Sequence, residues 1–282
     1  MHEYLKLSET QKIIIRNLHE FWKHVASTGV IAAIETDNFF LINNVDPNYH
    51  YVGDIKNLNI KEALLNPVFY LRATNQNVHE CIQKILKIYR EKNLPICWLV
   101  GPDSFPTTID ELLTRYGLNQ SMDLDGIFAD INPELTKITI PADVKLVCVD
   151  KKTQFKDWIR PIQYVYKMSD LATECYRKVF EELFAKTNAF KHYISYYQGE
   201  PIASSTLFLG SDSAGLYNRA SLPLSAKLGY RLALTTMIGN ELNEAVKLGY
   251  RHATSQCAPR VTRAIRNFNF KAYLTFKIFY GI

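Results

Sequence analysis

The chain has 282 residues, 47% of them hydrophobic, and a formal net charge of +5. That length and apolar content can bury a sizeable core and leave room for one large domain or two. No apolar run of about 18 residues is present, and charged residues are scattered through the start of the chain, so neither a membrane-spanning helix nor a cleaved signal peptide is predicted.

The first half is predicted to mix helices and short strands. Ser8 and Gln11 form a capping box, and apolar residues at helical spacing follow to about residue 27. The pattern then predicts two strands joined by a Thr-Asp-Asn turn within residues 29–45, a strand at 66–74, a helix at 77–92, a strand at 94–100, a helix at 107–116 that begins with Thr108-x-x-Glu111, and a strand at 124–131.

A domain boundary is predicted close to the middle of the chain. Residues 132–143 hold two prolines, Pro133 and Pro141, and few large apolar residues, which is typical of a linker. We therefore expect a first domain at residues 1–137 and a second domain at residues 138–282.

The second half starts again with a strand and then builds a larger antiparallel unit. Alternating apolar and polar residues at 190–222, with turns at Gln198-Gly199 and Gly210-Ser211, predict a three-stranded meander. The other predicted elements are a strand at 144–149, two helices between residues 151 and 185, a helix at 232–248 that ends at Gly249, a strand at 251–257, a short helix at 260–267 and a strand at 270–279. Both halves share this coarse plan.

The segment LPLSAKLGYR, residues 222–231, joins the meander to the next helix. A strand, a tight turn and a helix start aim free backbone amides at one point, where the helix macrodipole also favours an anion. Gly229 permits close approach of the backbone, and Lys227 and Arg231 add positive charge. A pyrophosphate site is predicted here, with an ordinary strand-to-helix turn as the alternative.

The same loop resembles the signature of the GNAT superfamily of acyl-CoA-dependent N-acyltransferases, hydrophobic-Pro-x-x-[Gln/Arg]-x-x-Gly-x-[Gly/Ala]. Leu222 and Pro223 match its first positions and Gly229 its central glycine, whereas Ala226 and Arg231 depart from it. The segments HYISYYQGEPIASSTLFL, AGLYNRASLP and SQCAPRVTRAIRNFNFKAY resemble the neighbouring strands and helix of that family.

The first half resembles the degenerate first half of tandem GNAT proteins, through LPICWLVGPDSFP and MDLDGIFADI, and has no glycine loop after VFYLRAT. The resemblance implies an α+β fold of two GNAT-like domains, with mixed, mostly antiparallel sheets flanked by helices. It places the acyl-CoA site in the second domain and leaves the first as a scaffold or a substrate-facing domain.

The resemblance also implies which residues bind acyl-CoA. The end of the last meander strand would bind the pantetheine arm through its backbone, the loop and helix start would bind the pyrophosphate, and Arg263 would reach a phosphate if its face of the helix lines the groove, with solvent exposure as the alternative. These predicted cofactor-binding residues are Arg219, Ala220, Ser221, Leu222, Lys227, Leu228, Gly229, Tyr230, Arg231, Leu232 and Arg263.

Catalytic groups are less clearly marked. Asn218 and Tyr217 are the polar residues nearest the expected acyl group, where a water that they hold would accept the proton of the amine. Ile265 stands where the family has a proton-donating tyrosine, and Cys257 is the remaining candidate donor, with a buried apolar role as its alternative. No metal site is predicted.

The resemblance implies an N-acetyltransferase that moves an acetyl or other acyl group from acetyl-CoA to the primary amine of an unidentified small molecule or protein. The alternative is a catalytically silent GNAT fold that acts as a protein-interaction module. Neither nucleic acid nor membrane is expected as a partner. An odd number of widely spaced cysteines indicates a reducing compartment, so a cytoplasmic location is expected, with secretion as a host-directed effector left open.

Overall fold

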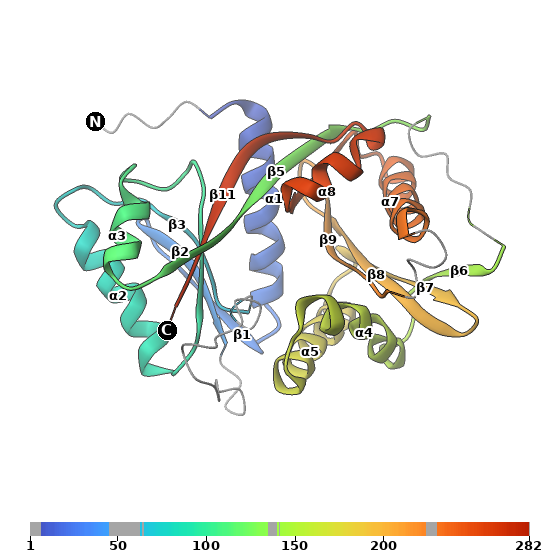
Figure 1. The fold of residues 1–282 in the computed structure, drawn as a ribbon, viewed down its shortest axis with the longest axis horizontal. Helices are drawn as coiled ribbons and strands as arrows, with labels where there is room; N and C mark the ends of the chain where they lie inside the picture. Colours follow the sequence, from blue (N-terminus) through green and yellow to red (C-terminus); the bar gives the residue numbers. More distant parts are fainter. Residues whose placement is uncertain are drawn as a thin grey trace.

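The computed structural model describes residues 7–44, 63, 65–134, 140, 142–223 and 230–281. Its described strands form one 11-stranded sheet in the order β1-β2-β3-β4-β11-β5-β10-β9-β8-β7-β6 (Figure 1). Most neighbouring strands are antiparallel, and the parallel neighbours are β3 with β4 and β9 with β10. The predicted α+β class, with a mixed and mostly antiparallel sheet flanked by helices, is confirmed.

The first half begins with a well-capped helix. In α1 (Glu9–Ala26) the Ser8 side chain accepts from the Gln11 amide and the Gln11 side chain accepts from the Ser8 amide, which confirms the predicted capping box. The following elements are β1 (Ile31–Glu35), β2 (Phe39–Asn44), β3 (Pro67–Leu71), α2 (Val78–Glu91), β4 (Ile96–Val100), α3 (Ile109–Arg115) and β5 (Asn119–Asp130).

The second half repeats the meander, helix and strand of the first half after an extra strand and two helices. Its elements are β6 (Val144–Cys148), α4 (Phe155–Tyr166), α5 (Asp170–Lys186), β7 (Phe190–Tyr197), β8 (Glu200–Leu209), β9 (Ala214–Ser221), α7 (Tyr230–Lys247), β10 (His252–Cys257), α8 (Pro259–Ala264) and β11 (Lys271–Gly281). After α7 the chain reverses at Gly249, whose φ of 89° confirms the predicted left-handed cap.

Two predicted details are wrong. Thr108 makes no side-chain capping hydrogen bond at α3, since its backbone is not extended as a capping residue requires. Strand β5 begins at Asn119 instead of residue 124. The added residues are all exposed and, apart from Met122, polar, so they carry no alternating pattern, and pairing with β11 holds them in the sheet.

The two halves exchange strands through the long β5 and β11. The last strand, β11, leaves the second half and pairs with β4 and β5, while β5 pairs with β10 (Figure 1). The sheet is therefore continuous across the molecule. The predicted boundary between residues 137 and 138 lies outside the described residues and stays a prediction.

Helix α1 lies between the two halves and packs against both (Figure 1). On one side Trp22 contacts the ring of Phe69, and on the other Phe21 packs against Phe190 and stacks on Tyr217. One hydrophobic cluster thus spans both halves, and a second lies beneath α7 and α8. No helix in the described part of the chain is both long and apolar enough to span a membrane.

Candidate functional site

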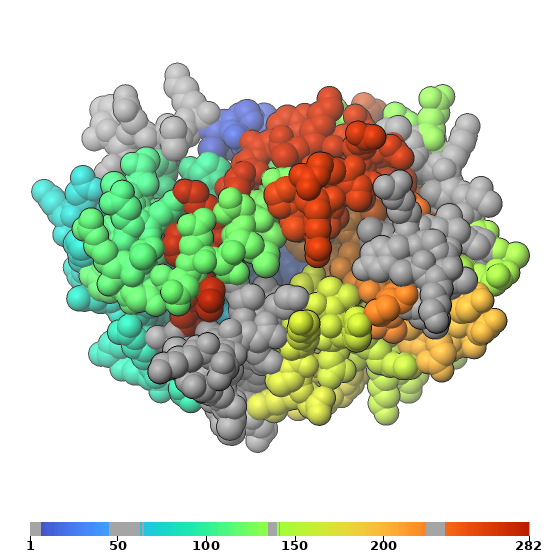
Figure 2. All heavy atoms as spheres, viewed as in Figure 1, coloured from blue at the N-terminus to red at the C-terminus, as the bar shows by residue number. Residues whose placement is uncertain are grey.

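The most open feature of the sheet is the divergence of β9 and β10. These parallel strands pair only at Ala214 with Ala253 and at Gly215 with Thr254, and no further pair joins them among the described residues. Beyond that point β9 stays hydrogen-bonded to β8 and β10 to β5. Figure 2 shows this face of the molecule hollowed between α8, in red, and α5, in yellow.

Strand β9 has a β-bulge where it begins to diverge. Asn218 has a φ of 52°, and the pairing register with β8 shifts between Ser204–Ala220 and Thr206–Tyr217. Asparagine is one of the few residues other than glycine that adopts this left-handed conformation readily. A bulge leaves main-chain groups outside the regular ladder and re-aims side chains, which is typical of strands beside binding sites.

A buried hydrogen-bond network holds Asn218 on the face of the sheet covered by α4 and α5. The Tyr176 hydroxyl donates to Asn218 Oδ1 at 2.5 Å, and Asn218 Nδ2 donates to Thr206 Oγ1 at 3.3 Å. Thr206 Oγ1 also lies 2.9 Å from Nδ1 of the buried His192. Burial lowers the pKa of His192 to about 3, so its ring is neutral at physiological pH.

On the opposite face, Arg219 connects the diverging strands. Its Nη2 donates to Ser255 Oγ at 3.0 Å, and Ser255 Oγ donates to the Leu216 carbonyl at 2.7 Å. Glu241 of α7 is fully buried nearby, and burial raises its pKa to about 7, although Arg219 and the Ser205 hydroxyl both favour the charged form. Side chains, and not a backbone ladder, therefore bridge the two strands here.

The other two predicted catalytic residues, Tyr217 and Cys257, make their hydrogen bonds outside the Asn218 network. Tyr217 faces α1, where its hydroxyl donates to Asn17 Oδ1 at 2.8 Å, and burial raises the pKa of that hydroxyl. Cys257 ends β10, with Sγ 3.4 Å from Thr262 Oγ1, which donates to Asp125 Oδ2 at 2.7 Å. Burial raises the pKa of the Cys257 thiol, while Thr262 and Arg219 lower it.

The predicted acyl-CoA residues are only partly described, and their role stays a prediction. Ala220 and Ser221 are buried at the end of β9, and the Leu222 amide donates to the Ile202 carbonyl at 2.8 Å. Arg263 is exposed on α8. Lys227, Leu228 and Gly229 lie outside the described residues, and for Tyr230, Arg231 and Leu232 only their place in the first turns of α7 is described.

The structure adds polar residues that the sequence did not single out: Tyr176, His192, Thr206, Thr262 and Glu241. Only Glu241 carries a usable signal, because it falls three residues after Ile238 and four before Ala245, on the apolar stripe of its helix. In the described part of the chain, no three His, Cys, Asp or Glu side chains gather as metal ligands would.

The first half contains a counterpart of the divergence, and its backbone closes it. Strands β3 and β4 also form only two parallel pairs, Pro67 with Cys97 and Val68 with Trp98. The chain after β4 then turns back onto β3. The Phe105 amide donates to the Leu71 carbonyl at 2.6 Å, and the Ala73 amide donates to the Phe105 carbonyl at 3.2 Å.

Comparison with known proteins finds similarity at the level of structure. No protein-family model and no curated protein sequence matches the chain. Among solved structures, a GCN5-related N-acetyltransferase from Kribbella flavida superposes with a TM-score of 0.64 at 10% identity, over 95% of each chain. A tandem GNAT protein from the clavulanic acid biosynthesis pathway gives a TM-score of 0.57 at 10% identity, over 96% of this chain and 93% of that one.

A third such structure, a GCN5-related N-acetyltransferase from Sphaerobacter thermophilus, gives a TM-score of 0.54 at 9% identity, over 86% of this chain and 80% of that one. These matches extend across both halves, and one of them is itself a tandem protein. The chain therefore has the fold of the GCN5-related N-acetyltransferase (GNAT) superfamily in its tandem arrangement, as the sequence resemblance predicts.

Proposed function

We propose that the chain is an acyl-CoA-dependent N-acyltransferase that takes an acetyl group from acetyl-CoA at the divergence of β9 and β10. The observation that carries this proposal is the pairing of these strands at two positions only. Beyond them, the end of β9 has no strand partner on its β10 side among the described residues. An extended acyl-pantetheine arm can occupy such a place as an added strand would.

In this proposal, backbone groups do most of the binding. The main chain of residues 219–222 binds the pantetheine arm whatever the side chains are. The pyrophosphate lies against the start of α7, with Gly229 for close approach and Lys227 and Arg231 for charge, which is the arrangement predicted from the sequence. Ala226 and Arg231 depart from the GNAT signature without removing a backbone donor.

The reaction needs the amine nitrogen to attack the thioester carbonyl, the carbon–sulfur bond to break and the leaving thiolate to gain a proton. A main-chain N–H freed by the bulge at Asn218 can stabilise the negative charge that develops on the carbonyl oxygen. Water, held by the polar groups near Asn218, accepts the proton of the amine. Cys257 is the candidate proton donor to the thiolate, because burial raises its pKa and keeps the thiol protonated at neutral pH.

The acceptor is proposed to be a primary amine of a small molecule or a protein. The structures named as N-acetyltransferases share this fold, and their names are the ground for choosing acyl transfer over other chemistry. A cytoplasmic location is part of the proposal. All five cysteines lie in the described part of the chain and none forms a disulfide, as is usual in a reducing compartment.

A protein-interaction module without catalysis is the second candidate function. The observation in its favour is Ile265, which is fully buried at the C-terminal end of α8, at the position where the family resemblance expects a proton-donating tyrosine. Loss of a general acid slows such a reaction by roughly 10²–10⁴-fold and does not prevent cofactor binding. The two candidates therefore differ first in whether acyl-CoA binds.

Calorimetric titration with acetyl-CoA, in moderate salt, tests the proposal. Wild-type protein is expected to bind one acetyl-CoA. Asn218→Gly retains the left-handed backbone and should bind within about threefold of wild type, whereas Asn218→Val strains it and should bind at least about tenfold more weakly. Gly229→Glu should abolish binding through bulk and charge. Equal binding by all four proteins would overturn the proposed site, and no binding by any of them would favour the interaction module.

A further inference from the structure

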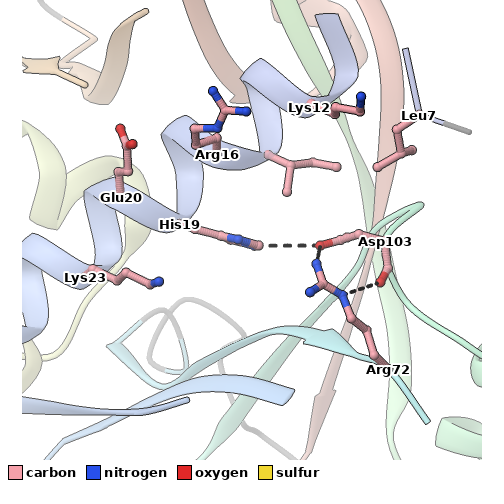
Figure 3. Close-up of a pocket in the computed structure, with 9 residues that line it drawn as sticks. Leu7, Lys12, Arg16, His19, Glu20, Lys23, Arg72 and Asp103 are labelled. Carbon is pink, nitrogen blue, oxygen red and sulfur yellow. Dashed lines mark hydrogen bonds and ion pairs between the residues drawn. The ribbon is translucent and has the colours of Figure 1, made fainter. Parts of the chain in front are cut away.

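A pocket lies in the first half, between α1 and the segments that follow β3 and β4. It has a volume of about 360 Å³, which suits a small metabolite. Figure 3 shows His19 and Lys23 reaching into it from α1, with Arg72 and Asp103 on the opposite wall and Lys12 at one end. None of these residues belongs to the proposed acyl-CoA site.

Asp103 is the unusual residue of this pocket. Its side chain is 4% exposed, and neither carboxylate oxygen has a hydrogen-bond donor among the described residues. Arg72 Nη2 and His19 Nε2 lie 3.6 and 3.8 Å from Oδ2, which are ion-pair distances and too long for hydrogen bonds (Figure 3). A buried carboxylate without hydrogen bonds is stabilised by any ligand that donates an O–H or N–H hydrogen bond to it.

The surroundings of Asp103 are positively charged. Burial, with smaller contributions from the nearby charges of Arg72 and Lys23, lowers the pKa of His19 to about 3, so the ring is neutral and lies in a positive field. Lys23 pairs with Glu35 and Lys12 with Glu9, but all four side chains are about half exposed or more. Exposed pairs of this kind contribute little, so both lysines can turn to a ligand.

A positive pocket with an acceptor-only carboxylate at its floor fits one kind of anion, namely an anion that also carries a proton on oxygen. We propose that this pocket binds a phosphate group, as inorganic phosphate or a small phosphate monoester. Arg72, Lys23 and Lys12 pair with its charged oxygens, and its P–O–H donates to Asp103. Arginine suits phosphate through its planar set of donors, and singly protonated phosphate supplies the missing hydrogen bond.

Sulfate is the matched probe for this proposal, because it has similar size and shape but no proton near neutral pH. In a calorimetric titration of the full chain near pH 6.5, phosphate is expected to bind at least about tenfold more tightly than sulfate. Asp103→Asn, whose amide can donate, should bring sulfate to within about threefold of phosphate. Glycerol 3-phosphate distinguishes the two sources of the group, since tighter binding than inorganic phosphate points to a monoester.

Arg72→Gln should abolish binding of both anions. Because Arg72 also stacks on Tyr70, so that its replacement can disturb the fold as well as the pocket, Lys12→Gln provides a surface variant. It should weaken phosphate binding about two- to fivefold, while Lys87→Gln on α2 should leave it unchanged. No phosphate binding to wild type, equal binding of phosphate and sulfate, or binding that Lys12→Gln and Arg72→Gln leave intact would each overturn the proposal.

Discussion

The two halves contain the same strand divergence but differ in which groups bridge the diverging strands. Both β3 with β4 and β9 with β10 make two parallel pairs and then separate. In the first half, Phe105 returns to pair with the end of β3, so backbone closes the space. In the second half the Ser255 side chain bridges the strands, through its hydrogen bonds with Arg219 and with the Leu216 carbonyl. One fold can thus hold an open and a closed copy of the same strand divergence, and the closed copy is made by the chain that follows β4.

Each half also places a buried carboxyl group near the arginine at or near the end of its third meander strand. Asp103 lies beside Arg72 in the first half, and Glu241 near Arg219 in the second. Burial raises the pKa of Asp103 to about 6 and that of Glu241 to about 7. Both halves therefore contain a carboxyl group whose ionised form is destabilised by burial. Such a group is more typical of binding sites than of structural cores.

The largest expected effect comes from Glu241→Gln. The folded-state pKa of Glu241 lies above its ordinary value of 4.5, so the folded protein holds a proton that the unfolded chain has lost, and stability falls as pH rises from about 4.5 to about 7. Relative to wild type, the variant should gain about 3 kcal/mol of unfolding free energy between pH 4 and pH 8.

Urea unfolding at both pH values measures this gain. Asp103→Asn should show the same sign, with its gain complete near pH 6 because that carboxyl titrates lower. A difference from wild type that does not change with pH would contradict the buried, uncharged state of Glu241.

A smaller loss of stability is expected from a substitution at the last position where the two parallel strands pair. The first half has Val68 at that position and the second half has Gly215, whose added Cβ would meet the side chains of Asn17 and Tyr217. Gly215→Ala should therefore cost about 1–2 kcal/mol, because these side chains must shift and their mutual hydrogen bond is disturbed. Thermal unfolding measures the cost. Gly281→Ala, with no atom closer than 3.4 Å to its new Cβ, is the control and should be nearly neutral.

The smallest expected loss of stability concerns two serines. Ser255 bridges β9 and β10 in the second half, and Ser104 is buried in the chain that closes the divergence in the first half. Ser255→Ala removes two hydrogen bonds and should cost about 1 kcal/mol, with little change in acetyl-CoA binding because the proposed site uses the backbone of β9 and not this side chain. Ser104→Ala removes a buried hydroxyl that has no hydrogen-bond partner among the described residues, so it should cost less or stabilise the protein. Equal losses in urea unfolding would show that the bridge contributes nothing specific.

Much of the fold is predictable from local pattern. The capping box of Ser8 and Gln11, the meander at 190–222 and the cap at Gly249 depend on neighbouring residues only, and all three are present. The exchange of β5 and β11 is not predictable in this way, because a strand's pattern shows which face is buried and not which distant strand it pairs with.

The candidate site, like the strand exchange, was only partly predictable from the sequence. Strand β9, as the last strand of the meander, was predictable from the sequence, but the bulge at Asn218 depends on the register with β8, which the sequence does not display. Asp103, His19 and Arg72 come from three separate elements that only the tertiary fold brings together. Buried polar side chains are hard to predict because isolated Asp, His and Arg residues look like surface residues in a sequence.

Hydrogen–deuterium exchange with and without acetyl-CoA tests the central claim most directly, because it reports on both divergences in one experiment. If the open copy alone binds the cofactor, protection increases in residues 214–222 and 252–257 and stays unchanged in residues 67–72 and 96–105. Protection that appears only in the first half, or in neither half at saturating acetyl-CoA, would contradict the account.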